Sequence, residues 1–467
     1  MKSADAAWIF DAHVLRRYDR LGPRYTSYPT APHFHEGFDH AAMVAAIERL
    51  QQRAPTTPLS LYIHVPYCSH PCFYCGCHRV ITRDRRKGGA YVQRILREAH
   101  TMAATILPDR PVVQIHLGGG TPNFLSPATI NDLIAGLQSD FCFAPLSQRD
   151  FSIELDPRTM DEDAIAALRA IGFNRVSFGV QDFDPAVQSA INRHQDVAQT
   201  LRLIRACRDN AIASVNIDLI YGLPRQRQEG FGRTLDTIVA ARPDRIAVYG
   251  YAHLPQRFRG QRQIREDTLP DGQTRLALLG LAVRTLTDAG YLYIGMDHFA
   301  LPNDPLALAQ RQGALHRNFM GYTTHADADL IGFGVSAISH IGDSYWQNAR
   351  DLGQWEAAID RCGIAVWRGL RLNAEDRLRA EIIQALMCQG RVDCLAVAQR
   401  HAIDFLSHFA DDLARLQPLV DDGFVTVTEQ TIAVTARGRP LVRLAAMCFD
   451  QYLDHTAERP LPYARTL

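Results

Sequence analysis

Two patterns of apolar residues alternate along most of this chain. Short apolar runs are followed by longer stretches in which apolar residues recur every three or four positions, as in an amphipathic helix. Residues 59–65 form the first run, and the helical pattern after it is marked by Tyr91, Ile95, Ala99, Met102 and Ile106. Further helices are predicted from about residue 127 and near residues 162–171. Further strands are predicted at residues 112–117, 151–155, 175–180, 214–220 and 245–251.

This alternation of strands and helices fixes the expected fold class as α/β. It predicts a parallel sheet whose strands are joined by right-handed crossovers. A partial or full β/α barrel of the TIM type is the natural closure of such a sheet. We place the barrel at residues 56–370, after an N-terminal arm at residues 1–55 that ends in a helix near residues 41–52.

The pattern changes after residue 370, where we expect a smaller, mostly helical domain at residues 371–467. A helix is predicted at residues 375–387, and two alternating runs predict a short hairpin. Thr435 has the character of an N-cap for a last helix that runs through Met447. Helices with a hairpin resemble a winged-helix module. Such modules often bind DNA, but no basic stripe is present, so we expect a packing or lid role. The remaining expected features are a helical apolar stripe of Leu406, Phe409, Leu413 and Leu416, and hairpin strands at residues 424–428 and 431–435.

Composition and charge narrow the range of partners. The 467 residues include 50 Lys plus Arg and 50 Asp plus Glu. This balance gives no overall field that favours nucleic acid or a membrane surface. No apolar run approaches the roughly 18 residues that a membrane span needs, and the first residues lack the features of a secretory signal. We therefore expect a cytoplasmic protein that binds neither nucleic acid nor membrane.

Four of the ten cysteines fall within ten residues, as Cys68, Cys72, Cys75 and Cys77. In a reducing compartment such a cluster usually binds metal or performs chemistry. A four-thiolate zinc site is one interpretation, although Cys75 and Cys77 are close together for two ligands of one tetrahedral ion. A fully ligated iron–sulfur cluster for electron transfer is a second. The third is a [4Fe–4S] cluster held by Cys68, Cys72 and Cys75, whose fourth iron stays open for a substrate.

Polar and glycine residues gather where the predicted strands end. The cysteine loop and the turn at residues 118–120 each follow a strand, and other polar residues occupy similar positions. In a β/α barrel the chemistry lies at these carboxyl ends. Glycines let the backbone approach a ligand closely. Carboxylates accept hydrogen bonds from hydroxyl and ammonium groups. The guanidinium of Arg193 can pair with a carboxylate through two hydrogen bonds. Each residue alone has an ordinary structural explanation, but several in register favour a site. The strand-end residues are Glu154, Gln181, Asp218, Ala252 and His253.

The spacing C-x3-C-x2-C, with the aromatic Tyr74 before the third cysteine, resembles the signature of radical S-adenosylmethionine (SAM) enzymes. In that superfamily three cysteines hold a [4Fe–4S] cluster. The open iron binds the amino and carboxylate groups of SAM, and reductive cleavage of SAM gives a 5′-deoxyadenosyl radical. The glycine turn one strand later resembles the segment that contacts the methionyl amino group in these enzymes.

Longer motifs narrow the resemblance to the oxygen-independent coproporphyrinogen III oxidase family. The likeness includes the segments GGGTP at 118–122, SIELDP at 152–157, GVQDF at 179–183, NIDLIYGLP at 216–224, YAHLP at 251–255, GMDHFA at 295–300, HRNF at 316–319, RYTSYPT at 24–30 and MCFD at 447–450. It also includes Cys77, and it covers nearly the whole chain. The resemblance implies oxidative decarboxylation of two propionates of coproporphyrinogen III to vinyl groups, which gives protoporphyrinogen IX for haem synthesis.

The resemblance also implies cofactor contacts and partners. Two SAM molecules are expected, with Cys68, Cys72 and Cys75 as the cluster ligands. A reducing donor such as flavodoxin or ferredoxin is expected, and a monomeric protein. The residues expected at the cluster-bound SAM are Tyr62, Gly119, Glu154 and Ile338; Tyr62 and Glu154 are also expected to be catalytic. Those expected at the second SAM are Tyr74, Gly120, Thr121, Gln181, Arg193, Asp218 and Ala252.

Two other functions remain open at this point. One is a haem-binding chaperone of a related family that keeps the three cysteines, although Cys77 and the long N-terminal arm favour the oxidase. The other is a structural zinc protein. For the proline-rich segment at residues 22–30, the hypothesis is that it closes over the barrel mouth and helps to position a propionate. The alternative is a passive packing arm.

Overall fold

The structure, a computed structural model, describes residues 17, 18 and 20–453. The chain divides into two compact units. The larger comprises Phe34–Pro270 and Asp327–Arg371, and the smaller comprises Met1–His33, Asp271–Ala326 and Leu372–Leu467. The smaller unit therefore includes residues 271–326, which we expected in the barrel, together with residues from both ends of the chain. The division at residues 55 and 370 therefore stays a prediction.

The larger unit is built on a mainly parallel sheet. Its central strand, β1 (Leu59–Val65), pairs in parallel with β4 on one side and with β13 on the other. Within this unit the strand order is linear from β16 to β8, so the described strands form a partial barrel. The parallel strands beyond β1 are β4 (Val112–Gly119), β5 (Asp150–Leu155), β6 (Arg175–Gln181), β7 (Ser214–Tyr221) and β8 (Arg245–Gly250). On the other side β13 (Asp329–Phe333) leads to the antiparallel strands β14 (Ile338–Ile341), β15 (Ser344–Asn348) and β16 (Val366–Arg371).

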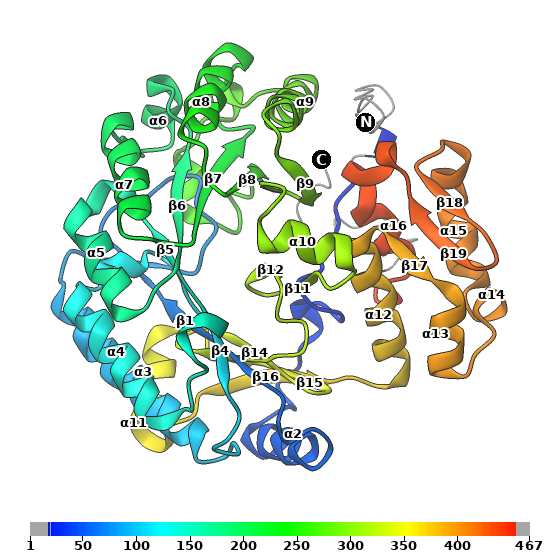
Figure 1. Ribbon diagram of the computed structural model, residues 1–467, viewed down its shortest axis with the longest axis horizontal. Helices are drawn as coiled ribbons and strands as arrows, with labels where there is room; N and C mark the ends of the chain where they lie inside the picture. The colour runs from blue at the N-terminus through cyan, green and yellow to red at the C-terminus, as the bar shows by residue number, and fades with distance from the viewer. Residues whose placement is uncertain (1–16, 19, 454–467) are drawn as a thin grey trace. The chain divides into compact units, whose positions relative to one another are not determined.

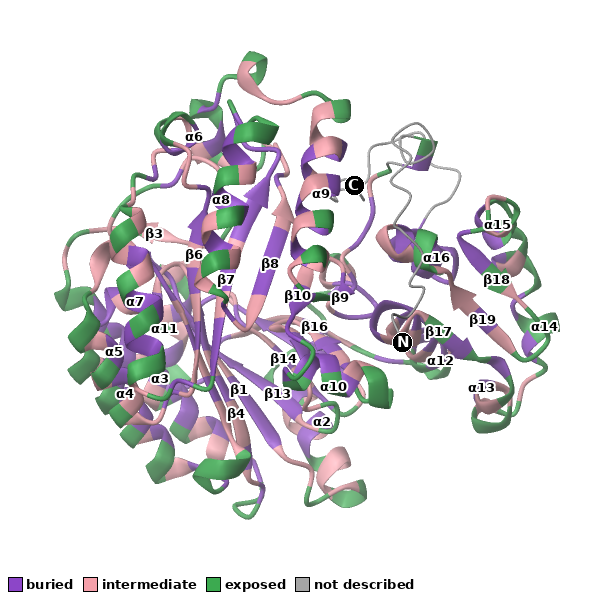
Figure 2. Cartoon of the chain, turned by 45° about the horizontal axis from the view of Figure 1, so that its top comes forward, coloured by how far each residue is buried: buried purple, intermediate pink, exposed green. Residues whose placement is uncertain are grey.

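Helices cover the outer side of these strands, as Figure 1 shows for α3 to α8. Their inner faces are buried and their outer faces are exposed (Figure 2). Side-chain caps begin several of them, such as Ser126 at α4 and Asp161 at α5; a cap of this kind satisfies a backbone N–H that has no helical partner. The helices are α2 (His40–Arg53), α3 (Arg86–Ala103), α4 (Pro127–Asp140), α5 (Glu162–Ile171), α6 (Pro185–Ala190), α7 (Val197–Asp209), α8 (Gln228–Ala241) and α11 (Leu352–Cys362).

The predicted strands and helices of this unit are confirmed. The bounds of β1 and α5 match the prediction, and the other predicted strands differ by no more than two residues at either end. The parallel α/β class is confirmed as well. Among the described residues, no helix combines the length and the apolar character that crossing a membrane requires.

The smaller unit contains the winged-helix-like order of elements. A helix and a strand are followed by three helices and a hairpin, and the sheet order is β17-β19-β18. Thr435 caps a 3-10 turn at Ala436–Leu441 that runs into α16 (Val442–Cys448), so the predicted cap is confirmed. The elements before it are α12 (Ala374–Gln389), β17 (Arg391–Asp393), α13 (Cys394–His401), α14 (Phe405–His408), α15 (Ala410–Asp421), β18 (Val425–Val427) and β19 (Thr431–Val434). The unit also contains α9 (Gly272–Asp288), β9 (Leu292–Gly295), β10 (His298–Ala300), α10 (Pro305–Gln312), β11 (His316–Asn318) and β12 (Gly321–Thr323).

The predicted apolar stripe needs a correction. The four residues do not share one helix, because α14 ends at His408 and α15 begins at Ala410. Phe409 lies at this break and is buried with Leu416, whereas Leu406 is 44% exposed. A spacing of three or four residues is therefore preserved across a change of helix axis, which the sequence pattern alone does not reveal.

The described part of the N-terminal segment packs inside the smaller unit. The hydroxyl of Tyr25 donates to Asp450 Oδ2 at 2.9 Å, and both residues are buried. The Nε of Arg443 donates to the carbonyl of Pro23 at 3.1 Å. Arg24 forms an ion pair with Asp297. These contacts explain why the segment is rich in aromatic residues; a role over the barrel mouth stays a prediction.

Candidate functional site

The cysteine loop follows β1 and is held by its own backbone. Cys68 ends the short strand β2 (Tyr67–Cys68), which pairs in parallel with β3 (Val80–Ile81). Past this ladder, Thr82 N donates to Cys68 O at 3.0 Å, and Arg79 Nη2 donates to Cys72 O at 3.0 Å. The loop is also tied to the segment after α6, since Asn192 Nδ2 donates to Pro71 O at 2.7 Å. The cysteine side chains are therefore presented by a fixed turn.

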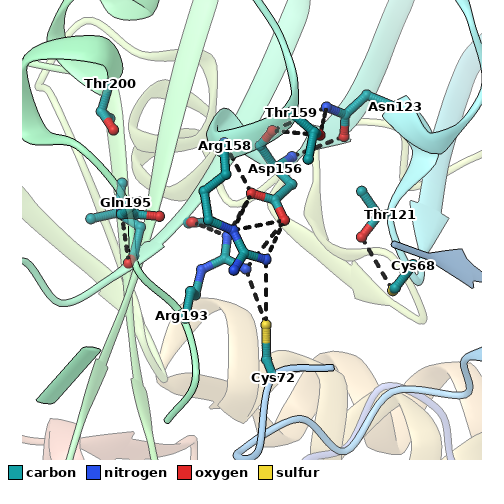
Figure 3. Close-up of polar contacts among 12 residues, drawn as sticks. Cys68, Cys72, Thr121, Asn123, Asp156, Arg158, Thr159, Arg193, Gln195 and Thr200 are labelled. Atoms are coloured by element: carbon teal, nitrogen blue, oxygen red, sulfur yellow. Dashed lines mark hydrogen bonds and ion pairs between the residues drawn. The ribbon is translucent and has the colours of Figure 1, made fainter. Parts of the chain in front are cut away.

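Polar groups approach the sulfur atoms of two cysteines (Figure 3). Thr121 Oγ1 donates to Cys68 Sγ at 3.2 Å. Two guanidinium groups face Cys72 Sγ, with Arg193 Nη1 at 3.4 Å and Arg158 Nη2 at 3.6 Å. Hydrogen bonds to a sulfur favour its charged form, and cations do so more strongly. These surroundings suit thiolate ligands.

The four cysteines differ in exposure and acidity. Cys68 and Cys72 are buried, Cys75 is half-buried and Cys77 is exposed. Burial raises the pKa of the Cys68 thiol to about 11, against the opposing hydrogen bond from Thr121. A hydrogen bond from Cys77 lowers the pKa of Cys75 to about 6. Cys77 thus makes Cys75 more acidic. Cys77 itself is exposed, unlike Cys68 and Cys72, whose sulfur atoms face the polar groups.

Asp156 joins the two arginines that face Cys72 (Figure 3). Its Oδ2 lies 2.6 Å from Arg158 Nη2, and its Oδ1 lies 3.4 Å from Arg193 Nη2. Burial alone would raise the pKa of this carboxyl, but Arg193 and Arg158 outweigh that effect and lower the pKa to about 2. Asp156 lies in the SIELDP segment at residues 152–157, but neither its role nor that of Arg158 was predicted from the sequence. The signal available was an acidic residue two positions before an arginine at a strand end.

The glycine turn needs glycine because of close neighbours. Gly119 has a φ of +113°, and a Cβ there would lie 2.6 Å from the ring of His64. A Cβ on Gly120 would lie 2.6 Å from the carbonyl oxygen of Pro66. Gly119 N donates to Glu154 Oε2 at 3.3 Å. The turn is thereby packed between the end of β1 and the carboxylate on β5.

Tyr62 and Glu154 are connected through a histidine that the sequence reasoning missed. The rings of Tyr62 and His116 stack at 5.9 Å. His116 Nε2 lies 3.2 Å from Glu154 Oε1. The Tyr62 hydroxyl lies 3.0 Å from His64 Nδ1, and burial raises the pKa of Tyr62 well above its usual value. The strands β1, β4 and β5 therefore present one continuous polar row.

Asp218 does not lie at a strand end, as the sequence suggested, but within β7. Ser177 Oγ donates to its Oδ2 at 3.0 Å, and Asn216 Nδ2 donates to its Oδ1 at 2.8 Å. Burial, followed by repulsion from Glu154, raises the pKa of Asp218 to about 6. Side chains alternate between the two faces of a strand. The carboxylate of Asp218 therefore lies on the same face of the sheet as the polar residues at the neighbouring strand ends.

Gln181 and Arg193 meet above β6. Gln181 ends that strand with a φ of +68°. A Cβ on Gly179 would lie 2.9 Å from Gln181 Nε2 and 3.2 Å from Arg193 Nη2, so both side chains cross this glycine. Gly179 is the register partner of Asp218. The structure therefore brings Gln181, Arg193 and Asp218 into one group.

The remaining predicted residues are Tyr74, Ala252 and Ile338. Each is placed by a contact of its backbone carbonyl. Gln261 Nε2 donates to Tyr74 O at 2.9 Å and to Ala252 O at 3.1 Å, which brings those two together. Ile338 begins β14, and its carbonyl oxygen would lie 2.5 Å from a Cβ on Gly332. Gly332 is the register partner of Tyr62.

The cysteine geometry can be tested against the metal interpretations. In the described part of the chain, no group of three or more His, Cys, Asp or Glu side chains is arranged to hold a single metal ion. A cluster that takes one thiolate per iron does not need its sulfurs around one point. The two buried cysteines with their donors, and the acidified Cys75, fit such a group.

Comparisons with known proteins agree with this site. The model of the Radical SAM superfamily matches residues 62–238, which include the cysteine loop, and the HemN C-terminal domain model matches residues 372–441. Oxygen-independent coproporphyrinogen III oxidase of Salmonella typhimurium is 46% identical over 448 residues, covering 96% of each chain. The protein of the same name from Helicobacter pylori strain 26695 is 39% identical over 445 residues, covering 95% of this chain and 97% of its own.

A solved structure gives the same result for the fold. It is that of coproporphyrinogen III oxidase (HemN) from Escherichia coli, described as a radical SAM enzyme. Its TM-score is 0.91 at 44% sequence identity, and the match covers 96% of this chain and all of that one. The chain therefore belongs to the oxygen-independent coproporphyrinogen III oxidase family of radical SAM enzymes.

Proposed function

We propose that this enzyme oxidatively decarboxylates two propionate side chains of coproporphyrinogen III to vinyl groups, giving protoporphyrinogen IX in anaerobic haem synthesis. Each conversion removes one hydrogen atom, one carbon dioxide and one electron from a propionate. The observation that carries the proposal is the group of three cysteines with donors at their sulfurs, placed beside a polar row at the strand ends.

Cys68, Cys72 and Cys75 would hold a [4Fe–4S] cluster. With SAM bound, that cluster supplies the primary carbon radical that abstracts the hydrogen atom. The protein's part is to hold these thiolates charged and to keep water from the radical. Thr121 and Arg193 serve the first task through the hydrogen bonds described above.

For the cluster-bound SAM we propose contacts from Tyr62, Gly119, Glu154 and Ile338. Gly119 offers backbone without a side chain, and its N–H already holds Glu154. That carboxylate suits an ammonium group, because a charge-assisted hydrogen bond is stronger than a neutral one. Tyr62 and Glu154 are proposed as catalytic residues on this basis.

For a second SAM we propose contacts from Tyr74, Gly120, Thr121, Gln181, Arg193, Asp218 and Ala252. Arg193 is buried, and its Nε–H has no hydrogen-bond partner among the described residues. A buried donor without a partner is unfavourable, so a carboxylate of a bound ligand would satisfy it. Asp218 offers acceptors for hydroxyl groups.

The remaining features of the proposal concern the setting. A reducing one-electron donor such as flavodoxin or ferredoxin is needed. We propose a monomer in the cytoplasm that binds neither membrane nor nucleic acid. All ten cysteines are free thiols, which suits a reducing compartment.

Anaerobic turnover is the test. The iron-loaded protein, with SAM and dithionite, should convert coproporphyrinogen III to a product whose mass is lower by two carbon dioxide molecules and four hydrogen atoms. A protein that retains haem without converting the porphyrinogen would instead be the related chaperone. Iron and sulfide analysis of anaerobically prepared protein excludes or supports the zinc interpretation in the same preparation.

A further inference from the structure

A basic segment follows the cysteine loop directly. Residues 83–87 read Arg-Asp-Arg-Arg-Lys. The side chains of Arg83, Arg85, Arg86 and Lys87 are exposed, and Asp84 is the one acidic residue among them. Ile81, two residues before the segment, is 45% exposed although it lies in β3. We call Ile81, Arg83, Arg85, Arg86 and Lys87 the basic face.

Helix stability does not explain the basic face. Helix α3 begins at Arg86, and its N-cap, Arg85, makes no side-chain capping bond. The first turn carries no acidic residue and instead holds Arg86 and Lys87. Cations at this positive end of the helix dipole are unfavourable. Asp84 offsets part of this, since its Oδ1 accepts from Arg86 N at 3.2 Å. Asp84 also forms an ion pair with the Arg86 side chain, whose Nε lies 2.8 Å from Oδ1, so the charge that the helix leaves unexplained is that of Arg83, Arg85 and Lys87.

The backbone of Cys68, a proposed cluster ligand, lies beside the first residue of the basic face. Cys68 is the register partner of Ile81 in the β2–β3 pair. The carbonyl of Cys68 accepts from Thr82 N at 3.0 Å, and Arg83 is the next residue. The buried Cys68 side chain and the exposed face are thus on neighbouring strands, with only this ladder between their backbones.

A hollow of about 630 Å³ adjoins the basic face. Arg85 belongs to its lining together with apolar groups such as Phe124, Leu125 and Met160, and the exposed carboxylates of Asp161 and Asp163 line it as well. The Arg85 guanidinium lies over the ring of Phe124, 4.6 Å from its centroid. Because these two aspartates would repel an acidic partner, the hollow is not counted as part of the basic face.

We propose that the basic face is the docking site of the protein that reduces the cluster, and that this partner is a small protein with an acidic face around its one-electron carrier. The inference rests on the proposed function. One electron passes from the reduced carrier of the partner, which is oxidised, to the cluster, which is reduced; no proton or bond is exchanged. Opposite charges would steer the encounter and set its orientation.

The test reverses the charge of the basic face without disturbing Arg85, which is packed on Phe124. The variant is Arg83→Glu, Arg86→Glu, Lys87→Glu in the full-length, iron-loaded enzyme. The matched control is Arg205→Glu, Arg233→Glu, Arg242→Glu, three exposed arginines in α7, α8 and the residue after α8. Turnover is measured with reduced flavodoxin, an acidic protein, and separately with dithionite, which needs no docking surface. Binding of flavodoxin to each protein is also measured by titration calorimetry, which does not depend on activity.

With flavodoxin, the variant should show a rise in apparent KM of at least about tenfold and should lose most of the salt dependence that steering produces. With dithionite it should match the wild type, and the control should match the wild type with both. Equal flavodoxin kinetics in variant and wild type would overturn the proposal, as would an equal loss in the control. If the variant loses iron, the corresponding triple glutamine variant replaces it, with a smaller expected rise in KM.

Two results separate this inference from other causes. A wild-type enzyme that fails to act on coproporphyrinogen III even with dithionite refutes the proposed function rather than the docking site. Binding of duplex DNA to the wild type that the variant loses, with unchanged flavodoxin kinetics, would assign the basic face to nucleic acid and overturn the proposal.

Discussion

Arg193 Nη1 lies 3.4 Å from Cys72 Sγ, although 121 positions separate the two residues in the chain. The arginine reaches the sulfur from the loop between α6 and α7, and Asp156 on the segment after β5 holds its other face. Asp156 also holds Arg158 against the same sulfur (Figure 3). One carboxylate thus orients two cations toward one ligand. The charge on that ligand, and the ease with which the cluster accepts an electron, should depend on this arrangement.

Replacing Arg193 should separate cluster assembly from cluster function. In Arg193→Gln the three cysteines remain, so iron should still be incorporated. Loss of an oriented group beside a metal ligand typically reduces activity or metal affinity about 10–100-fold, and loss of a nearby cation should lower the reduction potential of the cluster. Potentiometric EPR measures that shift. Arg193→Lys, which keeps the charge, should recover part of the potential but less of the activity; identical potentials in all three proteins would contradict the argument.

The three proposed cluster ligands should not be replaceable by serine. Cys68→Ser, Cys72→Ser and Cys75→Ser should each lose most of the iron and the activity, because each thiolate binds a separate iron. Iron analysis and absorbance of anaerobically prepared protein check this. Normal iron content and turnover in any one of the three would refute the ligand assignment.

Cys77→Ser is the matched control for Cys75→Ser, because it makes the same replacement of sulfur by oxygen two residues further along the chain. Cys77 is exposed, and the assignment leaves it off the cluster, so its serine variant should keep the iron. Activity should fall only through misplacement of Cys75, which Cys77 N contacts at 3.4 Å. Complete loss of iron would instead indicate four-thiolate ligation.

The sequence predicted the sheet well for a simple reason. The apolar runs are short and bounded by glycine, proline and polar residues, and parallel strands buried on both faces require such runs. It also predicted that polar residues gather at one edge of the sheet, because parallel strands end at the same edge, although Asp218 lies within β7 rather than at its end. It missed Arg158 and His116, which look like ordinary polar residues until a neighbouring strand brings a sulfur or a carboxylate to them. The break at Phe409 was missed because a helical spacing does not specify one axis.

Glu98 was also missed, and it leads to a prediction about pH. It lies on the buried face of α3 and is 2% exposed. Gly334 N donates to its Oε2 at 2.8 Å, and Asn348 Nδ2 donates to its Oε1 at 2.6 Å. Burial nonetheless raises the pKa of Glu98 from 4.5 to about 7. The carboxylate holds the turn between β13 and β14, which leads into Ile338.

The sign of the pH effect follows from that shift. Between pH 4.5 and 7 the folded protein keeps a proton on Glu98 that the unfolded chain has lost, so the free energy of unfolding falls as the pH rises through this window. The loss approaches a value on the order of 3 kcal/mol above pH 7. In Glu98→Gln the difference in stability between pH 5 and pH 8 should shrink by about that amount, as measured by denaturant unfolding. Glu229→Gln, at an exposed position in α8, should leave the difference unchanged, and an unchanged difference in Glu98→Gln would contradict the prediction.

The N-terminal segment offers the last prediction, which separates a packing role from a substrate role. Removing residues 1–30 would not be a clean test, because Tyr25 and Tyr28 belong to the buried core of the smaller unit. Arg24 is better suited, since its ion pair with Asp297 is partly exposed and such a pair contributes about 0–1 kcal/mol to stability. If the segment positions a propionate, Arg24→Gln should unfold almost as the wild type does, bind SAM normally and show a KM for coproporphyrinogen III raised about tenfold, as expected for loss of a charge-assisted hydrogen bond of about 1.5–3 kcal/mol. Tyr25→Phe is the structural control: it leaves the buried Asp450 without this donor and should lower stability by about 1–3 kcal/mol without changing KM. An unchanged KM in Arg24→Gln would leave the segment with packing as its role.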